Sequence, residues 1–187
     1  MKGMSGVLLA AVAVLGLAAC EDGPVTLTEA EAKSLFVSLA KTPQGDPVSE
    51  SADKNVYGCP DGGTVTVTGT GSIDEKGDTS TIRLQQVLVP EGCGANGLVL
   101  DGDPAVTYAT NTTFVGNIGD ATMDGGAKGL LKWRKGEDEG TCDIDLTLAA
   151  EEKLTRDIPV LEGAFKGKLC GHEVEIAAAE VIRIVLD

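Results

Sequence analysis

Apolar and polar residues alternate along much of the chain after residue 60, and this period of two predicts β-strands. In residues 64–68 the valines lie on one face and the threonines on the other. Residues 79–89 continue the alternation beyond a turn at residues 76–78, so the two segments predict a hairpin. A change of phase at residues 85–86 predicts a β-bulge. The residues expected to face inward on the second strand are Ile82, Leu84, Val87 and Val89.

A second predicted hairpin has the clearest phase in the chain. Residues 127–134 and 142–148 alternate on either side of the turn-rich residues 136–140, and Trp133 falls on the core side. The facing strand places its own apolar residues on one side, and they are Cys142, Ile144, Leu146 and Leu148. We therefore expect Trp133 to pack in the core.

A third hairpin joins residues 165–169 to residues 174–178, and Gly171-His172 predicts a type II′ turn between them. Further strands are predicted at residues 98–100, 105–109, 113–116, around Thr122 and at 181–186. Consecutive hairpins without long helical crossovers predict an antiparallel meander. The fold class is therefore mainly β, as a curved sheet or a partly closed barrel.

The segment before these strands has a helical period. Residues 28–41 begin with a capping box of Thr28 and Glu31, and Pro43 lies just beyond their end. The apolar residues that recur on one helix face are Ala32, Leu35, Phe36, Leu39 and Ala40. We expect this amphipathic helix to pack on an open face or mouth of the sheet. Residues 42–55 are expected to be an irregular connection.

Composition and charge narrow the class of protein. The chain has 187 residues, with 15 basic and 29 acidic residues and a formal net charge of -14. Because such a surface repels phosphate backbones, we expect no nucleic-acid partner. Aromatic residues make up 3%, which leaves few platforms for stacking sugars or bases. Residues 20–187 are expected to form a single domain.

The N-terminus carries a signal for export. Lys2 precedes a short apolar run, and the run ends at Leu17-Ala18-Ala19-Cys20. This pattern resembles the lipobox of bacterial lipoprotein precursors, in which the cysteine sulfur receives a diacylglyceryl group and the chain is cleaved just before it. The resemblance implies that residues 1–19 are a lipoprotein signal peptide and that Cys20 is the lipidated first residue of the mature chain.

The same resemblance implies a location in the cell envelope, with the protein held at a membrane by its lipid anchor. Stable anchoring needs more than one acyl chain, and the multiply acylated cysteine of the family meets that condition. We favour the outer membrane over the inner membrane. The alternative is ordinary secretion, with Cys20 as a spare thiol.

Four further cysteines predict two disulfides, because an exported chain folds under oxidising conditions. The predicted pairs are Cys59–Cys93 and Cys142–Cys170. The first pair flanks the hairpin turn near residue 77 and the second flanks a loop near residues 156–157. Facing strands would bring each pair within the ~7 Å between Cα atoms that a disulfide requires. A zinc or redox site fits poorly because the chain has no CxxC spacing.

The sequence offers little catalytic chemistry. His172 is the only histidine, and its predicted place in a tight turn favours a solvent-exposed side chain over a general base. Gly125-Gly126 lacks a phosphate-loop pattern and is predicted to be a turn. No cofactor is expected. Acidic turns are expected to be solvated, and the candidate ligands for a cation are Asp101 and Asp103. The local basic residues, which we expect to balance neighbouring acids, are Lys128, Lys132, Arg134 and Lys135.

These features favour a non-enzymatic envelope lipoprotein, in which a disulfide-stapled β module binds an unidentified protein or small molecule or serves a structural role. The alternative is a carrier or binder of an apolar ligand, held in a cavity between a curved sheet and its helix. A continuous apolar hollow would favour the carrier, whereas a filled core would favour the plain module. An enzyme would need a cleft with converging acids.

Overall fold

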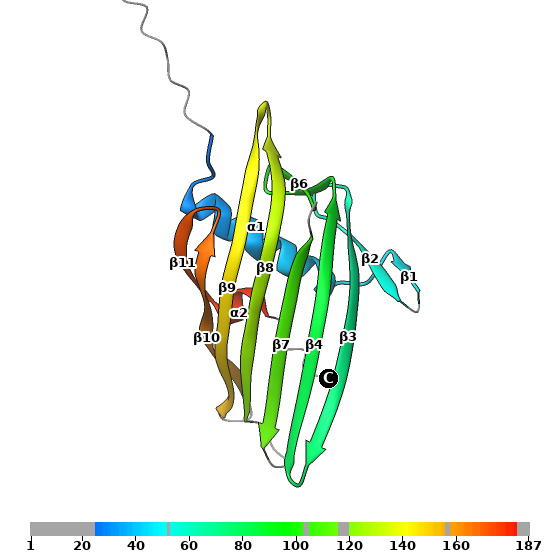
Figure 1. The fold of residues 1–187 in the computed structure, drawn as a ribbon, viewed down its shortest axis with the longest axis vertical. Helices are drawn as coiled ribbons and strands as arrows, with labels where there is room; N and C mark the ends of the chain where they lie inside the picture. The colour runs from blue at the N-terminus through cyan, green and yellow to red at the C-terminus, as the bar shows by residue number, and fades with distance from the viewer. Residues whose placement is uncertain (1–24, 52, 103–104, 116–119, 156–157, 183–187) are drawn as a thin grey trace, which may run out of the picture.

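The computed structural model describes residues 25–51, 53–102, 105–115, 120–155 and 158–182, and these residues form a mainly β structure (Figure 1). The expected signal peptide, Cys20 and Asp103 lie outside the described residues. The described part confirms the coarse prediction of a large antiparallel sheet accompanied by one amphipathic helix.

Eleven strands of the described residues belong to one sheet. They are β1 (Ser49–Glu50), β2 (Lys54–Gly58), β3 (Thr64–Lys76), β4 (Thr79–Glu91), β5 (Cys93–Ala95), β6 (Leu98–Asp101), β7 (Val106–Val115), β8 (Ala121–Lys135), β9 (Asp138–Thr155), β10 (Ile158–Leu169) and β11 (His172–Ala177). The spatial order is β1-β2-β3-β4-β7-β8-β9-β10-β11, and β5 and β6 form a side hairpin that pairs with β8. Because the end strands β1 and β11 do not pair with each other, the sheet is open and does not close into a barrel.

Several strands are longer than predicted because glycines continue them. The predicted turn at Gly125-Gly126 is wrong, since both residues lie inside β8. A Cβ atom on Gly125 would lie 2.0 Å from the backbone oxygen of Ala109, and one on Gly126 would lie 2.1 Å from that of Leu146. The neighbouring strands approach so closely that only glycine fits, so here the glycine pair marks a tight strand contact and not a turn. Strand β7, which has no glycine, also unites two segments that were predicted separately.

The pairing of β3 with β4 keeps one register along its whole length. The β-bulge predicted at residues 85–86 is therefore wrong. Leu88 is buried under the helix, while Val87 and Val89 lie on the opposite face and are half-buried. Apolar residues on both faces of one regular strand produced the apparent change of phase.

The third hairpin turns one residue earlier than predicted. Strands β10 and β11 pair as far as Leu169 and His172, so the two turn residues are Cys170 and Gly171. Their φ angles are 50° and 86°, and positive φ at both positions is typical of a type I′ turn. The last predicted strand is wrong at its start, because Ala178–Val181 form the short helix α2. The rest of that prediction, after Ile182, lies outside the described residues.

Helix α1 (Glu29–Lys41) begins at Thr28, as predicted. The Glu31 backbone N–H donates a hydrogen bond to the Thr28 hydroxyl, and the Thr28 backbone N–H donates one to the Glu31 carboxylate. The apolar residues of α1 join one core cluster with the sheet, and Phe36 meets Phe165 of β10 edge-on with ring centroids 5.4 Å apart. We call the sheet face that α1 packs against the inner face. The helix therefore supplies core residues to one face of the sheet.

The connection after α1 is more regular than predicted. It contains the 3-10 helix η1 (Thr42–Gln44), β1 and the start of β2. The short polar strands pair at the edge of the sheet, where backbone hydrogen bonds matter more than apolar alternation. Among the helices of the described residues, none combines the length and apolar character needed to cross a membrane.

Two disulfides fasten the sheet in the predicted pairing. Cys59 and Cys93 have Cα atoms 5.4 Å apart, and Cys142 and Cys170 have Cα atoms 4.1 Å apart. Cys93 and Cys142 belong to the core cluster that α1 also joins. Both disulfides therefore strengthen the part of the sheet that is packed under the helix.

Candidate functional site

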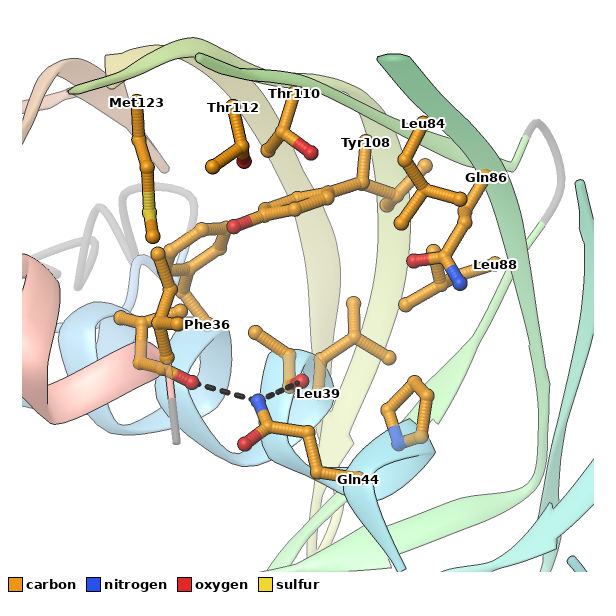
Figure 2. Close-up of a pocket in the computed structure, with 15 residues that line it drawn as sticks. Phe36, Leu39, Gln44, Leu84, Gln86, Leu88, Tyr108, Thr110, Thr112 and Met123 are labelled. Carbon is orange, nitrogen blue, oxygen red and sulfur yellow. Dashed lines mark hydrogen bonds between the residues drawn. The ribbon is translucent and has the colours of Figure 1, made fainter. Parts of the chain in front are cut away.

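An apolar cavity of about 300 Å³ lies between the helices and the inner face of the sheet (Figure 2). Its volume is at the lower end of the range for small-molecule sites. Strands β4, β7 and β8 supply the sheet side, which is lined by Leu84, Gln86, Leu88, Val106, Tyr108, Thr110, Thr112 and Met123. The helical side is lined by Phe36, Leu39, Ala40, Pro43, Gln44, Val181 and Ile182. None of the lining residues within the described ranges has a charged side chain.

Alternation along β4 and β7 builds the sheet side of the cavity. Every second residue of a strand points to the same face, so one row of each strand meets the cavity. The cross-strand pairs in these rows are Leu88–Val106, Gln86–Tyr108, Leu84–Thr110 and Ile82–Thr112. The wall therefore changes from purely apolar pairs at one end to mixed pairs of apolar and uncharged polar residues.

Small residues on β8 make room beside this wall. The inner-face residues of β8 that pair with Tyr108 and Thr110 are Ala127 and Gly125. The Tyr108 ring approaches Phe165 of β10 with ring centroids 5.9 Å apart, although β8 and β9 lie between their strands. Larger side chains in place of Ala127 and Gly125 would keep the Tyr108 ring from approaching Phe165. An aromatic ring lying beside strand glycine is also a known way to cover the exposed backbone.

Exposure increases along the cavity wall from one end to the other. Leu88 and Val106 are 4% and 2% exposed, whereas Leu84 and Ile82, further along the same rows, are 38% and 39% exposed. The cavity therefore has a deep end at Leu88 and Val106 and an open end at Leu84. We use these two names below.

Tyr108 is the most distinctive polar residue of the lining. Burial raises the pKa of its hydroxyl far above the usual value of 10, so the hydroxyl stays protonated. Figure 2 shows the ring spanning the cavity between β7 and the side of Phe36 and Met123. Within the described part of the chain, no protein group makes a hydrogen bond with this hydroxyl, so the donor is available to a ligand.

Gln44 closes part of the helical side. Its side-chain nitrogen donates to the backbone oxygen of Ala40 at 3.0 Å and to that of Val181 at 2.7 Å (Figure 2). One amide thus connects the end of α1 with the end of α2. These bonds satisfy two carbonyls at helix ends, which otherwise lack partners.

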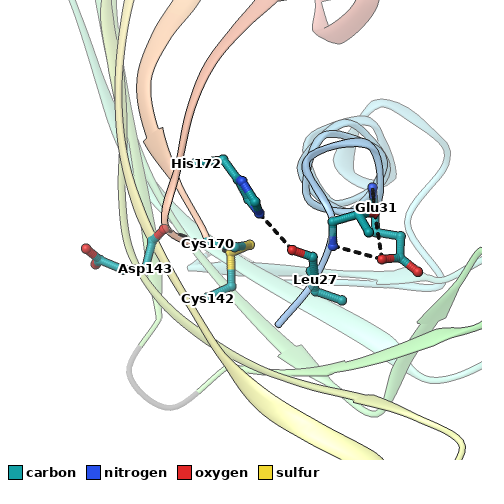
Figure 3. The surroundings of a disulfide bond; sticks show 7 residues. Leu27, Glu31, Cys142, Asp143, Cys170 and His172 are labelled. Carbon is teal, nitrogen blue, oxygen red and sulfur yellow. Dashed lines mark hydrogen bonds between the residues drawn. A yellow bond between two sulfur atoms is a disulfide. The ribbon is translucent and has the colours of Figure 1, made fainter. Parts of the chain in front are cut away.

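The chain before α1 is held by a hydrogen bond to β11, the last strand in the order of the sheet. The His172 ring nitrogen Nε2 lies 2.7 Å from the backbone oxygen of Leu27 and donates to it (Figure 3). His172 is half-buried at the first position of β11, so the predicted solvent-exposed turn histidine is wrong. Because the turn consists of Cys170 and Gly171, His172 is the first residue of the strand and not part of the turn. Its role in the described structure is to hold the entry to the helix.

Of the two candidate cation ligands, only Asp101 lies within the described residues, and it has a structural role. Asp101 accepts a hydrogen bond from the Gly92 backbone N–H at 2.8 Å and lies 3.4 Å from Arg134. Its carboxylate therefore fixes the connection between β4 and β5. Asp103 lies outside the described residues. Among the residues that are described, no three His, Cys, Asp or Glu side chains come together as a metal site would need.

Three of the four local basic residues balance acids, as expected. Their partners form the ion pairs Lys128–Asp145, Arg134–Asp101 and Lys135–Glu31. The last pair joins the β8–β9 hairpin to the first turn of α1, and it holds the pKa of Glu31 down to about 2, with help from Thr28. Trp133 is buried in the core on the same strand, as predicted. This region is therefore a structural support for the helix.

The residues that line the cavity were not predicted as a site. One signal was present, because Tyr108, Thr110 and Thr112 place polar groups on one face of a single strand. Dividing β7 into two predicted segments hid that continuity. The helical side could not be assigned from sequence alone, since the lining residues of α1 resemble ordinary core residues.

Comparison of the chain with family models, with curated proteins and with solved structures finds no match. The geometry of the cavity and the sequence of the N-terminus therefore carry the functional argument.

Proposed function

We propose that this protein is a non-enzymatic lipoprotein of the cell envelope, anchored through acylated Cys20, that binds an apolar ligand between its helix and its sheet. The observation that carries the proposal is the cavity of about 300 Å³ with an uncharged, largely apolar lining. An apolar cavity of roughly 150 Å³ binds benzene, so this volume accommodates roughly a dozen carbon atoms. A single acyl chain fits that description.

The cavity favours a binder over a purely structural module. A protein interior is normally packed to the density of an organic crystal, with few voids larger than a water molecule. Here a hollow lies directly beside well-packed residues such as Leu88, Val106 and Phe36. The hollow opens at Leu84, so its apolar lining faces water unless a ligand covers it, and an apolar occupant would be stabilised there.

The shape of the sheet agrees with this use. Neighbouring strands are about 4.8 Å apart, so β7 and β10 would be roughly 14 Å apart across a flat sheet. The contact between Tyr108 and Phe165 at 5.9 Å supports an inner face that is concave at this point. A concave face beneath a helix is the arrangement that we propose encloses the ligand.

The anchor is proposed from the lipobox-like segment that ends at Cys20, and we favour the outer membrane. Its test is the intact mass of the protein purified from membranes. We expect a chain that begins at Cys20 and carries the added mass of its acyl groups, palmitate among them. A chain that retains residues 1–19 without acylation would overturn this part of the proposal and leave the cavity argument in place.

Binding is tested by photolabelling the membrane-anchored protein in vesicles with an acyl chain that carries a diazirine. We expect the probe to become covalently attached to peptides from β4 and β7. Thr110→Phe places a ring in the cavity and should reduce labelling at least tenfold. Ala109→Phe is the matched control, because Ala109 is exposed on the opposite face of the same strand. Equal labelling of both variants would overturn the proposed binding site.

A further inference from the structure

The cavity wall changes from apolar pairs at the deep end to pairs that mix apolar and uncharged polar residues towards the open end, and this order indicates how a ligand is oriented. Leu88 and Val106 form the deep end, while Tyr108, Thr110 and Thr112 follow towards the open end. A hydrocarbon tail gains most where it is fully removed from water. The tail of a bound molecule therefore belongs at the deep end, and its first polar group belongs beside Tyr108 and the threonines.

The same wall restricts the charge of that polar group. Among the described residues, no Lys or Arg lines the cavity, so a buried anion would have no cationic partner there. Beyond the open end, the inner-face positions of β3 and β9 are taken by Glu75 and Glu152. The formal net charge of the chain is -14. An anionic headgroup would therefore meet these carboxylates beyond the open end, and inside the cavity it would lack a cationic partner among the described residues.

The Tyr108 hydroxyl defines what the polar group must offer. Its raised pKa keeps the proton in place, so it acts as a donor to a ligand oxygen. The hydroxyls of Thr110 and Thr112 can both donate and accept, and they lie on the same face of β7. This set suits a carbonyl oxygen at Tyr108 with neighbouring hydroxyl groups at the threonines.

We infer that the ligand is a neutral single-chain acyl ester, such as a monoacylglycerol, with its carbonyl hydrogen-bonded to Tyr108. The inference rests on the proposed function, because it names the chemical class of ligand for the same cavity. The volume admits one chain and excludes a molecule that must bury several chains. The hydroxyls of Tyr108, Thr110 and Thr112 can hydrogen-bond the ester and the glycerol hydroxyls, and the described lining offers no cationic partner to an acyl anion.

The test measures how well unlabelled competitors displace the diazirine acyl probe from the membrane-anchored protein. The competitors are a monoacylglycerol, an alkyl phosphate and an alkane of equal chain length. We expect the monoacylglycerol to compete about fivefold better than the alkane, which is the effect of one net hydrogen bond. The alkyl phosphate should compete less well than the monoacylglycerol.

The matched variants are Tyr108→Phe and Tyr57→Phe, which remove the hydroxyls of the two tyrosines of the chain. Tyr108→Phe should abolish the fivefold preference and leave displacement by the alkane unchanged, which also shows that the variant is folded. Tyr57 lies on β2 outside the cavity lining, so Tyr57→Phe should keep the preference.

The outcomes separate this inference from the proposed function. If Thr110→Phe blocks labelling but Tyr108→Phe retains the preference, the ligand class is wrong and the cavity remains a binding site. A preference for the alkyl phosphate would also overturn the ligand class alone. If the probe labels no cavity residue in the unaltered protein, both the proposed function and this inference fail.

Discussion

Two halves of the same sheet have opposite surroundings. In the covered half, the inner-face residues lie under α1 and are almost fully buried; they include Val65, Val67, Leu88, Leu131 and Trp133. In the open half, the same strands continue beyond the helix, as Figure 1 shows for β3, β4 and β7. There Ile73, Ile82 and Leu84 are 67%, 39% and 38% exposed on the same face. Both disulfides include a cysteine of the covered half.

The difference shows that alternation alone does not make a core. Both halves place apolar residues on the inner face, yet only the covered half has a second layer packed on it. A sheet buries its apolar face only against another element. The cavity lies where the helix no longer covers the sheet, so the covered half supplies stability and, on the proposed function, the open half gives the ligand access. Substitutions in the two halves should therefore have unequal effects.

The largest effect is expected for Phe165→Ala in the covered half. Phe165 is fully buried and contacts both Phe36 of the helix and Tyr108 of the cavity wall. Removing the ring should lower the free energy of unfolding by about 4 kcal/mol, measured by chemical denaturation. Ile82→Ala in the open half is the comparison, and it should cost less than about 1 kcal/mol because its side chain is already partly in water. If the two variants lost equal free energy of unfolding, the covered and open halves would not differ in their contribution to stability.

The next effect is the loss of a disulfide from the covered half. The double variant Cys142→Ala/Cys170→Ala removes a bond with a sequence separation of 28. On the loop-entropy model this should lower the free energy of unfolding by about 3.5 kcal/mol. Denaturation under non-reducing conditions measures it.

The second disulfide provides the control for this prediction. Cys59→Ala/Cys93→Ala removes a bond with a separation of 34, so loop entropy predicts a nearly equal loss. A loss below about 1 kcal/mol for either pair would show that the bond does not contribute to the covered half as proposed.

The sequence predicted features that depend on local patterns more accurately than features that depend on neighbouring strands. The helix, its capping box, the disulfide pairs and the hairpin that contains Trp133 follow from local patterns, because these residues alternate cleanly and end in recognisable turns. The predictions were wrong at residues 85–86 and at Gly125-Gly126, and also at the turn of the third hairpin and at Val181. At residues 85–86 and at Gly125-Gly126, the structure is decided by contacts with the neighbouring strand. The alternation of residues within one segment carries no information about those contacts.

The candidate site was harder to predict for the same reason. Tyr108 and Phe165 are distant in the chain and meet across two intervening strands. The hollow depends on small residues of β8 such as Gly125 and Ala127, whose meaning appears only once the strand register is known. Asp101 is a residue for which the sequence suggested a site that the structure does not support. Its carboxylate contacts the Gly92 backbone N–H and the Arg134 side chain.

A smaller effect is expected for Gly125→Ala, which tests the narrow strand contact beside the cavity. Gly125 has a φ angle of 153°, and an added Cβ atom would lie 2.0 Å from the backbone oxygen of Ala109. We expect the free energy of unfolding to fall by about 2 kcal/mol, with reduced probe labelling as the strands separate. Gly71→Ala in the open half is the matched control, since its Cβ atom would meet Arg83 only at 3.6 Å. It should change stability by less than about 0.5 kcal/mol.

The smallest effect concerns the ion pair that holds α1 over the covered half. Lys135 and Thr28 lower the pKa of Glu31 from its usual 4.5 to about 2. Because the pKa is lower in the folded protein, the pair stabilises the fold above pH 4.5, and this contribution is lost as the pH falls towards 2. Glu31→Gln should therefore flatten the fall of the unfolding free energy between pH 5 and pH 2, measured by denaturant titration at each pH. Lys135→Met removes the partner and should flatten it in the same direction. If Lys135→Met leaves the slope unchanged, the hairpin does not hold the helix through this pair.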